Sequence, residues 1–214
     1  QIYSNYELGY LFGFFLGDGD SRLHTNLVNE KSSSKSGRVT FYIHKDDKEI
    51  ISKTERSIYS VVGKEPKKVY ENNVCLLVLY SKQWAEFFNS FGKLEQKHLP
   101  SEFYCLNKNY LKGLYDGLID SDGNIDKNNS HNFTNTSTEL IELFGFVTYN
   151  LYGYFPSVSN GTLSNSDKVK AKNESFRSKH SCGGQLSKRI INENLQAIVT
   201  SYSENEVEIT VYDL

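Results

Sequence analysis

Two aspartates, Asp18 and Asp122, each precede a glycine at the end of an apolar stretch with glycines four residues apart. The stretches are LGYLFGFFLGDGD (residues 8–20) and LKGLYDGLIDSDG (residues 111–123). If both are helices whose C-terminal ends meet, the two carboxylates share one small site. Carboxylates and helix C-termini both favour a divalent cation, which would relieve the repulsion between the acids. A single Asp-Gly is more simply a helix stop, but two copies favour a shared metal site.

The glycines indicate how the two helices would pack. Gly9, Gly13 and Gly17 share one face of the first stretch, and Gly113 and Gly117 share one face of the second. Glycines four apart let helix backbones approach until they touch. Both stretches are shorter than the roughly 20 residues of a membrane span. We therefore predict two helices packed side by side in parallel, with Gly13 and Gly117 at their interface.

The sequence after the first stretch predicts the elements that hold it. GRVTFYIHK, residues 37–45, alternates apolar and polar residues, as a half-buried strand does. Helical spacing follows in residues 47–63, which end on a glycine. A strand pair near 66–71 and 74–80 and a helix over 81–92 complete the order αββαββα.

The same order begins again after the second stretch. Short strands are predicted near 123–127 and 131–136, followed by a helix over 137–153 that starts with a serine or threonine cap. Further strands are predicted near 154–159 and within 162–180. We expect an α+β protein with two pseudo-symmetric halves, residues 1–100 and 101–194, related like the subunits of a symmetric dimer.

Net charge, the distribution of basic residues and the cysteine spacing limit which partners the protein is expected to have. The 214 residues carry a net charge of −2, which by itself argues against nucleic acid. Basic residues nevertheless gather between acidic stretches, at 31–38, 64–68 and 168–179. The three cysteines have neither zinc-site nor disulfide spacing. Without a leader-like or membrane-length apolar run, we expect a soluble, intracellular monomer, and the absence of methionine suggests a fragment of a longer polypeptide.

With both motifs in view, the chain resembles the LAGLIDADG homing endonucleases of the single-chain, two-motif type. YDGLIDSDG, residues 115–123, matches the family's nonapeptide at its glycine, leucine, isoleucine, both aspartates and final glycine. LFGFFLGDG, residues 11–19, keeps the leucine, the helix glycine and the closing Asp-Gly. Leu16 replaces the first aspartate of the motif, which does not bind metal in the family.

The resemblance implies a site for Mg²⁺ or Mn²⁺ held by Asp18 and Asp122, with backbone carbonyls of Gly17 and Ser121 completing the coordination. KHLPSEF, residues 97–103, resembles the segment before the second motif in intein endonucleases. There the lysine lies by the scissile phosphate, and Lys97 takes that role here; the alternative is a solvated surface lysine. The second half offers no clear counterpart, which leaves undecided Lys179, Lys188 and Arg189.

The implied activity is site-specific cleavage of double-stranded DNA at a long asymmetric target, with antiparallel sheets forming a saddle over the duplex. Six polar residues of the first strands suit contacts to bases or phosphates, although each could equally be an ordinary solvent-facing residue. They are Arg22, His24, Asn26, Arg38, Tyr42 and His44.

Two other functions stay open from the sequence. One is a member that has lost cleavage and acts as a DNA- or RNA-binding regulator or maturase, against which the two intact aspartates argue. The other is a protein-splicing element with an inserted endonuclease, since EVEITVYDL near the end resembles the start of an intein's C-terminal splicing segment. Residues 195–214 are therefore expected to form C-terminal strands, either the edge of a splicing domain or a plain terminal strand. The chain lacks the N-terminal nucleophile and C-terminal His-Asn that splicing needs.

Overall fold

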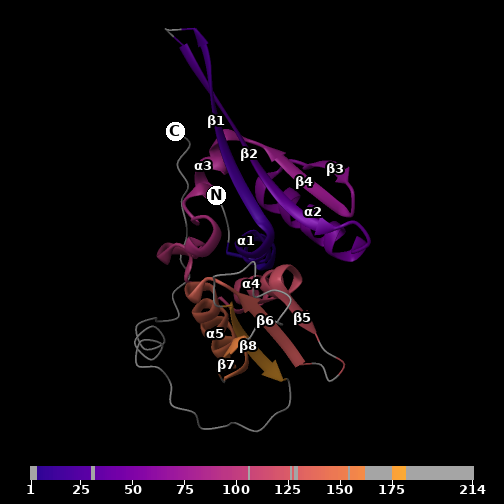
Figure 1. Ribbon diagram of the computed structural model, residues 1–214, viewed down its shortest axis with the longest axis vertical. Coiled ribbons are helices and arrows are strands. Elements are labelled where there is room, and N and C mark those ends of the chain that lie inside the picture. The colour runs from indigo at the N-terminus through magenta and orange to yellow at the C-terminus, as the bar shows by residue number, and fades with distance from the viewer. Residues whose placement is uncertain are drawn as a thin grey trace.

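Helices α1 (Tyr6–Asp18) and α4 (Lys108–Asp122) lie together at the centre of the molecule, with one sheet on either side (Figure 1). The computed structural model describes residues 4–29, 32–105, 107–125, 127, 130–153, 155–161 and 175–181. Asn5 caps α1 by accepting a hydrogen bond from the backbone N–H of Leu8 at 2.9 Å, and Asn107 caps α4 in the same way. Side chains of α1 from Leu8 to Leu16 are buried all round, as befits a central helix.

The two central helices are parallel and in backbone contact. Gly9 faces Tyr110, Gly13 faces Leu114, and Gly17 faces Ser121, so residue numbers rise together along both helices. A Cβ added at Gly13 would lie 2.9 Å from the backbone nitrogen of Leu118 and closer still to the Leu114 oxygen. Glycine is required at these contacts because a real Cβ essentially never comes within 3.0 Å of another heavy atom.

The first half has the predicted order αββαββα. After α1 come β1 (Gly19–Asn29), β2 (Ser32–His44), α2 (Lys48–Val62), β3 (Lys67–Glu71), β4 (Val74–Tyr80) and α3 (Lys82–Asn89). The strands form one antiparallel sheet in the order β1-β2-β4-β3. The predicted alternation in β2 is confirmed toward its end, because Val39, Phe41 and Ile43 are buried while Tyr42 and His44 are exposed; Thr40, on the same face as Tyr42, is buried.

Aromatic rings fill the space between this sheet and the central helices. Phe12 lies 5.1 Å, centroid to centroid, from both Phe91 and Phe103, and Phe15 lies 4.3 Å from Phe88. These rings come from α1, α3 and the segment that connects the halves. The aromatic-rich composition therefore builds a core that fixes the end of α1, where Asp18 lies.

The second half repeats the arrangement as far as it is described. It contains β5 (Gly123–Ile125), β6 (Ser130–Asn135), α5 (Thr138–Tyr152), β7 (Ser157–Gly161) and β8 (Ser175–Ser181). The sheet order β5-β6-β8-β7 matches that of the first half. The predicted Ser cap of α5 is present, as Ser137 Oγ accepts a hydrogen bond from the N–H of Leu140 at 3.3 Å. The C-terminal segment 195–214, Lys188 and Arg189 lie outside the described residues.

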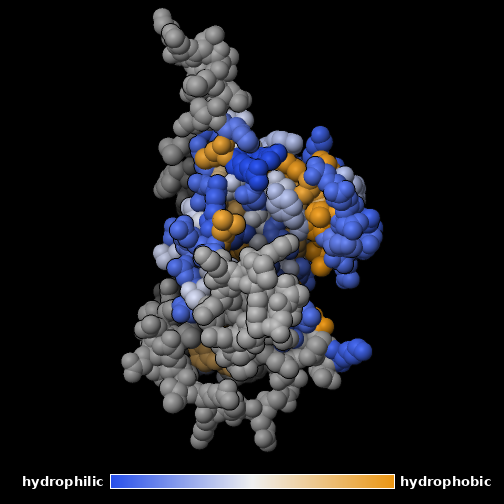
Figure 2. Space-filling view, viewed as in Figure 1, coloured by the Kyte–Doolittle hydropathy of each residue, from blue (hydrophilic) through white to orange (hydrophobic). Residues whose placement is uncertain are grey.

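Two predicted boundaries were too long. The helix predicted over 81–92 ends at Asn89, because the next turn tightens to i→i−3 hydrogen bonds and Gly92 adopts a left-handed φ of 77°. The strand predicted to reach residue 127 ends at Ile125. None of the described helices has both the length and the apolar character that crossing a bilayer requires. The visible surface of the first half is mostly hydrophilic, with smaller groups of hydrophobic residues (Figure 2).

Candidate active site

Asp18 and Asp122 are the last residues of α1 and α4, and the parallel packing brings these helix ends together. A Cβ added at Gly17 would lie 3.1 Å from Asp122 Oδ2, so the second carboxylate reaches the backbone of the first helix. Burial, and after it the negative charge of Asp122, raise the pKa of Asp18 from 3.8 to about 6. Two partly buried acids thus share one small region at two helix C-termini, as the motifs predicted.

Asn135, at the end of β6, holds the second carboxylate. Its Nδ2 donates a hydrogen bond to Asp122 Oδ2 at 2.6 Å, and its Oδ1 accepts one from the N–H of Ser137 at 2.8 Å. Burial raises the pKa of Asp122, and this hydrogen bond, followed by the charge of Lys97, opposes the rise. Sequence reasoning missed Asn135. The signal that could have found it is its place, two residues before the cap of a helix that follows the motif.

Lys97 lies at the same place, in the segment that connects the halves. Its Nζ donates hydrogen bonds to the carbonyl oxygens of Phe15 at 3.0 Å, Gly17 at 2.8 Å and Gly19 at 2.8 Å. Burial lowers the pKa of Lys97, and the charges of the two aspartates act against that change. This position does not fit the solvated surface lysine that the sequence left open.

A chain of hydrogen bonds connects the backbone of Lys97 to Asp122. Ser137 Oγ donates to the Lys97 carbonyl oxygen at 3.0 Å, and the Ser137 N–H donates to Asn135, which in turn donates to the carboxylate. The N-terminus of α5 therefore positions both the connecting segment and one of the two acids.

The oxygen atoms that could bind a metal at this site suit a hard divalent cation. Two carboxylates and the carbonyls of two helix C-termini are oxygen ligands, which Mg²⁺ and Mn²⁺ prefer. The Gly17 carbonyl among them accepts a hydrogen bond from Lys97. Within the described ranges, no group of three or more histidine, cysteine, aspartate or glutamate side chains could hold a metal by itself. Asp18 and Asp122 would bind the ion, and water or a phosphate would have to complete its coordination. Ser121 Oγ is turned back on α4, where it donates to the Gly117 carbonyl at 2.9 Å, so only the Ser121 carbonyl could serve.

The other two acids of the second motif, Asp116 and Asp120, accept hydrogen bonds from side chains of neighbouring helices. Tyr10 donates to Asp120 at 3.0 Å, and Lys53 of α2 donates to the same oxygen at 2.8 Å. Tyr6 donates to Asp116 at 2.8 Å. Asp120 thus joins three helices, whereas Leu16, its counterpart in the first motif, is fully buried.

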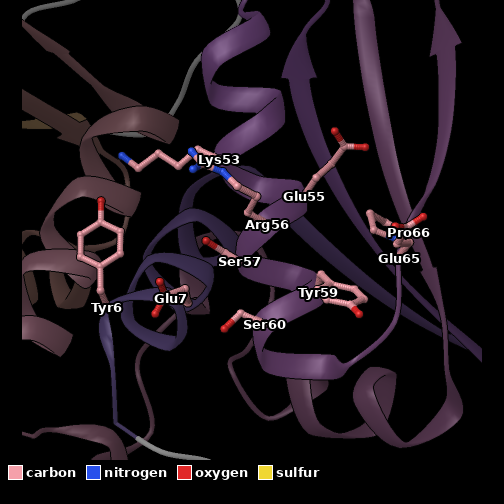
Figure 3. A pocket seen from close by; sticks show the side chains of 10 residues that line it. All are labelled: Tyr6, Glu7, Lys53, Glu55, Arg56, Ser57, Tyr59, Ser60, Glu65 and Pro66. Carbon is pink, nitrogen blue, oxygen red and sulfur yellow. The ribbon is translucent and has the colours of Figure 1, made fainter.

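A cavity of about 700 Å³ lies at the other end of α1, between that helix and α2 (Figure 3). Tyr6, Glu7, Lys53 and Arg56 are among its lining residues. At 1.5 Å per residue, Tyr6 is about 18 Å from Asp18 along the helix. The cavity is therefore separate from the paired carboxylates.

Most of the residues proposed to contact DNA lie on one face of the first sheet. Arg22 of β1 pairs with Arg38 of β2, which pairs with Tyr80 of β4, and residues directly opposite one another project to the same face. Tyr42 and His44 follow Arg38 on that face and are exposed. Tyr80, 53% exposed, was missed because only the strand register places it beside Arg38.

The two arginines of this face, Arg22 and Arg38, differ in exposure and in hydrogen bonding. Arg22 is exposed and its Nε donates to Asp20 at 2.6 Å, which raises the Arg22 pKa. Arg38 Nε is buried and has no hydrogen-bond partner in the described part of the chain. His24 is exposed on β1. Asn26 pairs with Ser34 through the backbone, and its side chain, like that of Lys179 in β8, lies outside what the structure describes.

Similarity to known proteins is found in structure rather than in sequence. No protein-family model matches the sequence, and no curated protein matches it. Mesophilic variants of the homing endonuclease I-DmoI superpose with a TM-score of 0.56 at 16% identity, over 83% of this chain and 90% of that chain. I-DmoI in complex with DNA and Mn gives the same values. I-DmoI in complex with DNA and Ca gives a TM-score of 0.57 at 16% identity, over 84% of both chains. The chain therefore has the fold of the LAGLIDADG homing endonucleases, as its two motifs predicted.

Proposed function

We propose that this protein is a site-specific DNA endonuclease that hydrolyses phosphodiester bonds in both strands of a long asymmetric target with Mg²⁺ or Mn²⁺. The observation that carries the proposal is the meeting of Asp18 and Asp122 at two parallel helix ends, with the Lys97 ammonium on the adjacent carbonyls. Burial and the negative charge of Asp122 raise the pKa of Asp18. A cation bound between the two carboxylates would lower that pKa again, because it stabilises the charged form.

The chain's own residues would position the metal and the phosphate. Asp18 and Asp122 bind the cation, and carbonyls of Gly17 and Ser121 are further ligands. When bound, the metal supplies Lewis acidity and lowers the pKa of a water molecule. Asn135 fixes the orientation of Asp122 through its 2.6 Å hydrogen bond. Lys97 stabilises negative charge on the phosphate or polarises the attacking water.

DNA would lie across the face of the first sheet that carries Arg22, Arg38, Tyr42 and His44. Arginine matches phosphates and guanine edges, and the exposed polar side chains of a sheet can enter the major groove. The buried, unpartnered Nε of Arg38 retains an unused donor, although it would have to become accessible before it could bind a phosphate. The second sheet would form the other side of a saddle and read the other half of the target.

I-DmoI, whose fold this chain shares, was crystallised with DNA and Mn. That comparison supports the fold, whereas the catalytic role of each residue rests on the geometry described above. The alternative is a protein of the same fold that binds DNA or RNA without cutting it. The retained pair of motif aspartates favours cleavage.

The test is cleavage of a library of long duplexes in the presence of Mg²⁺ or Mn²⁺, with sequencing of the cut ends. We expect double-strand cuts at one recurring sequence with wild-type protein and none with Asp122→Asn. Lys93→Met, a change at an exposed lysine of the connecting segment, is the matched control and should cut normally. Tight duplex binding without any metal-dependent cut would identify the binding protein instead.

A further inference from the structure

The ammonium of Lys97 already occupies a carbonyl expected to bind metal. A lysine has three N–H donors, and those of Lys97 have three backbone acceptors at the end of α1, with the Gly17 oxygen in the middle at 2.8 Å. All of its donors are therefore engaged within the protein, and none is left for a phosphate. This arrangement differs from the one that the proposed reaction needs.

The two aspartates have different neighbours. Asp18 ends the helix whose carbonyls hold the Lys97 ammonium. Asp122 instead accepts a hydrogen bond from the neutral amide of Asn135. Among the described residues, no lysine or arginine side chain donates to the Ser121 carbonyl. The Lys97 ammonium is therefore hydrogen-bonded on the α1 side of the pair, and its charge acts on both carboxylates.

We propose that Lys97 is an internal counter-cation that a divalent metal must displace from Gly17 before its ammonium becomes free to act. The proposal rests on the metal site put forward above. Both cations seek the same carbonyl oxygen beside the same two carboxylates, and like charges that close repel each other strongly in a partly buried site. Metal binding would thus release Lys97 toward the substrate.

The surrounding structure allows this movement to be local. The backbone of Lys97 is held in place because its carbonyl accepts a hydrogen bond from Ser137. The four-carbon stem of a lysine is flexible, so the ammonium can leave the helix end while the backbone stays fixed. The displaced donors would remain within reach of a phosphate bound at the aspartates.

The first experiment measures binding of Mn²⁺ alone to the full chain, without DNA, by electron paramagnetic resonance of the free ion. Lys97→Met keeps the length of the side chain and removes its charge, and Lys93→Met is the matched control. We expect Lys97→Met to bind Mn²⁺ at least about tenfold more tightly than wild type, because a competing charge next to the ion is removed. Equal or weaker binding by a folded Lys97→Met protein overturns the proposal, as does the absence of binding by both proteins.

A second experiment uses the wild-type protein and does not depend on how the variant folds. Amine acetylation with and without saturating Mn²⁺, read by mass spectrometry, should show Lys97 labelled several-fold faster with the metal and Lys93 unchanged. Asp122→Asn should remove the metal effect. Unchanged labelling of Lys97 overturns the proposal. Neither experiment measures cleavage, so a protein that passes both but never cuts DNA would refute only the proposed nuclease function.

Discussion

Adding one methyl group at Gly13 tests whether the backbones of α1 and α4 hold the two halves together. An alanine Cβ there would lie 2.9 Å from the Leu118 nitrogen and closer to the Leu114 oxygen, below the 3.0 Å that real Cβ atoms respect. No rotamer change can relieve a clash with backbone, so the helices must separate along their contact.

The expected magnitude follows from two opposing effects. Overpacking a well-packed core costs about 1–3 kcal/mol, and an unrelieved backbone clash belongs at the upper end. Replacing glycine by alanine in a helix returns about 1 kcal/mol of propensity. We therefore expect Gly13→Ala to lower the free energy of unfolding by about 2 kcal/mol, and Gly13→Leu or Gly117→Leu by more than about 3 kcal/mol.

Gly145 provides the matched control, because it is also a buried glycine within a helix. Among the described residues, the atom nearest to a Cβ there would be Phe155 Cδ1 at 3.8 Å. Gly145→Ala should leave stability unchanged or raise it by up to about 1 kcal/mol. Urea unfolding followed by circular dichroism measures all the variants. If Gly13→Ala were as stable as Gly145→Ala, the close contact of α1 with α4 would be refuted.

Three further predictions concern the site. Asp18→Asn or Asp122→Asn should abolish double-strand cleavage while duplex affinity stays within about tenfold, since the acids hold metal and contribute little to DNA contact; full cleavage by either variant would exclude the assignment. Because the pKa of Asp18 is raised from 3.8 to about 6, its protonated form favours folding, so metal-free stability should fall as pH rises through that interval. Urea unfolding of Asp18→Asn should show a smaller fall, because only Asp122 of the pair then has a raised pKa, and a pH profile identical to that of wild type would contradict the shift. Duplex affinity should fall as salt rises, with a slope of log K against log salt concentration steeper than about −3, because several phosphate contacts each release counterions. Fluorescence anisotropy measures this affinity, and no dependence on salt would point to another partner. Arg22→Ala or Arg38→Ala should make the slope shallower.

The sequence by itself determined the central helix pair and most of the element order. Glycine every fourth residue, ending on Asp-Gly, encodes a local backbone and a contact face, and its repetition predicts that two such faces meet. Alternation in β2 and the cap at Ser137 are also local signals. They placed α5 correctly and the second part of β2, which begins at Ser32 rather than at the predicted residue 37. Helix and strand ends did not follow from the sequence, because the final turn depends on packing, as between Asn89 and Gly92.

Only the tertiary structure decided which polar groups meet at the site. Asn135 reaches Asp122 across a strand pair, and Lys97 reaches the carbonyls of α1 from 78 to 82 residues away in the sequence. The row of Arg22, Arg38 and Tyr80 depends on strand register. Residue periodicity specifies which face of an element is buried, but not which side chain of a distant element completes a hydrogen bond. Those partners are fixed only when the two central helices and their sheets have packed together.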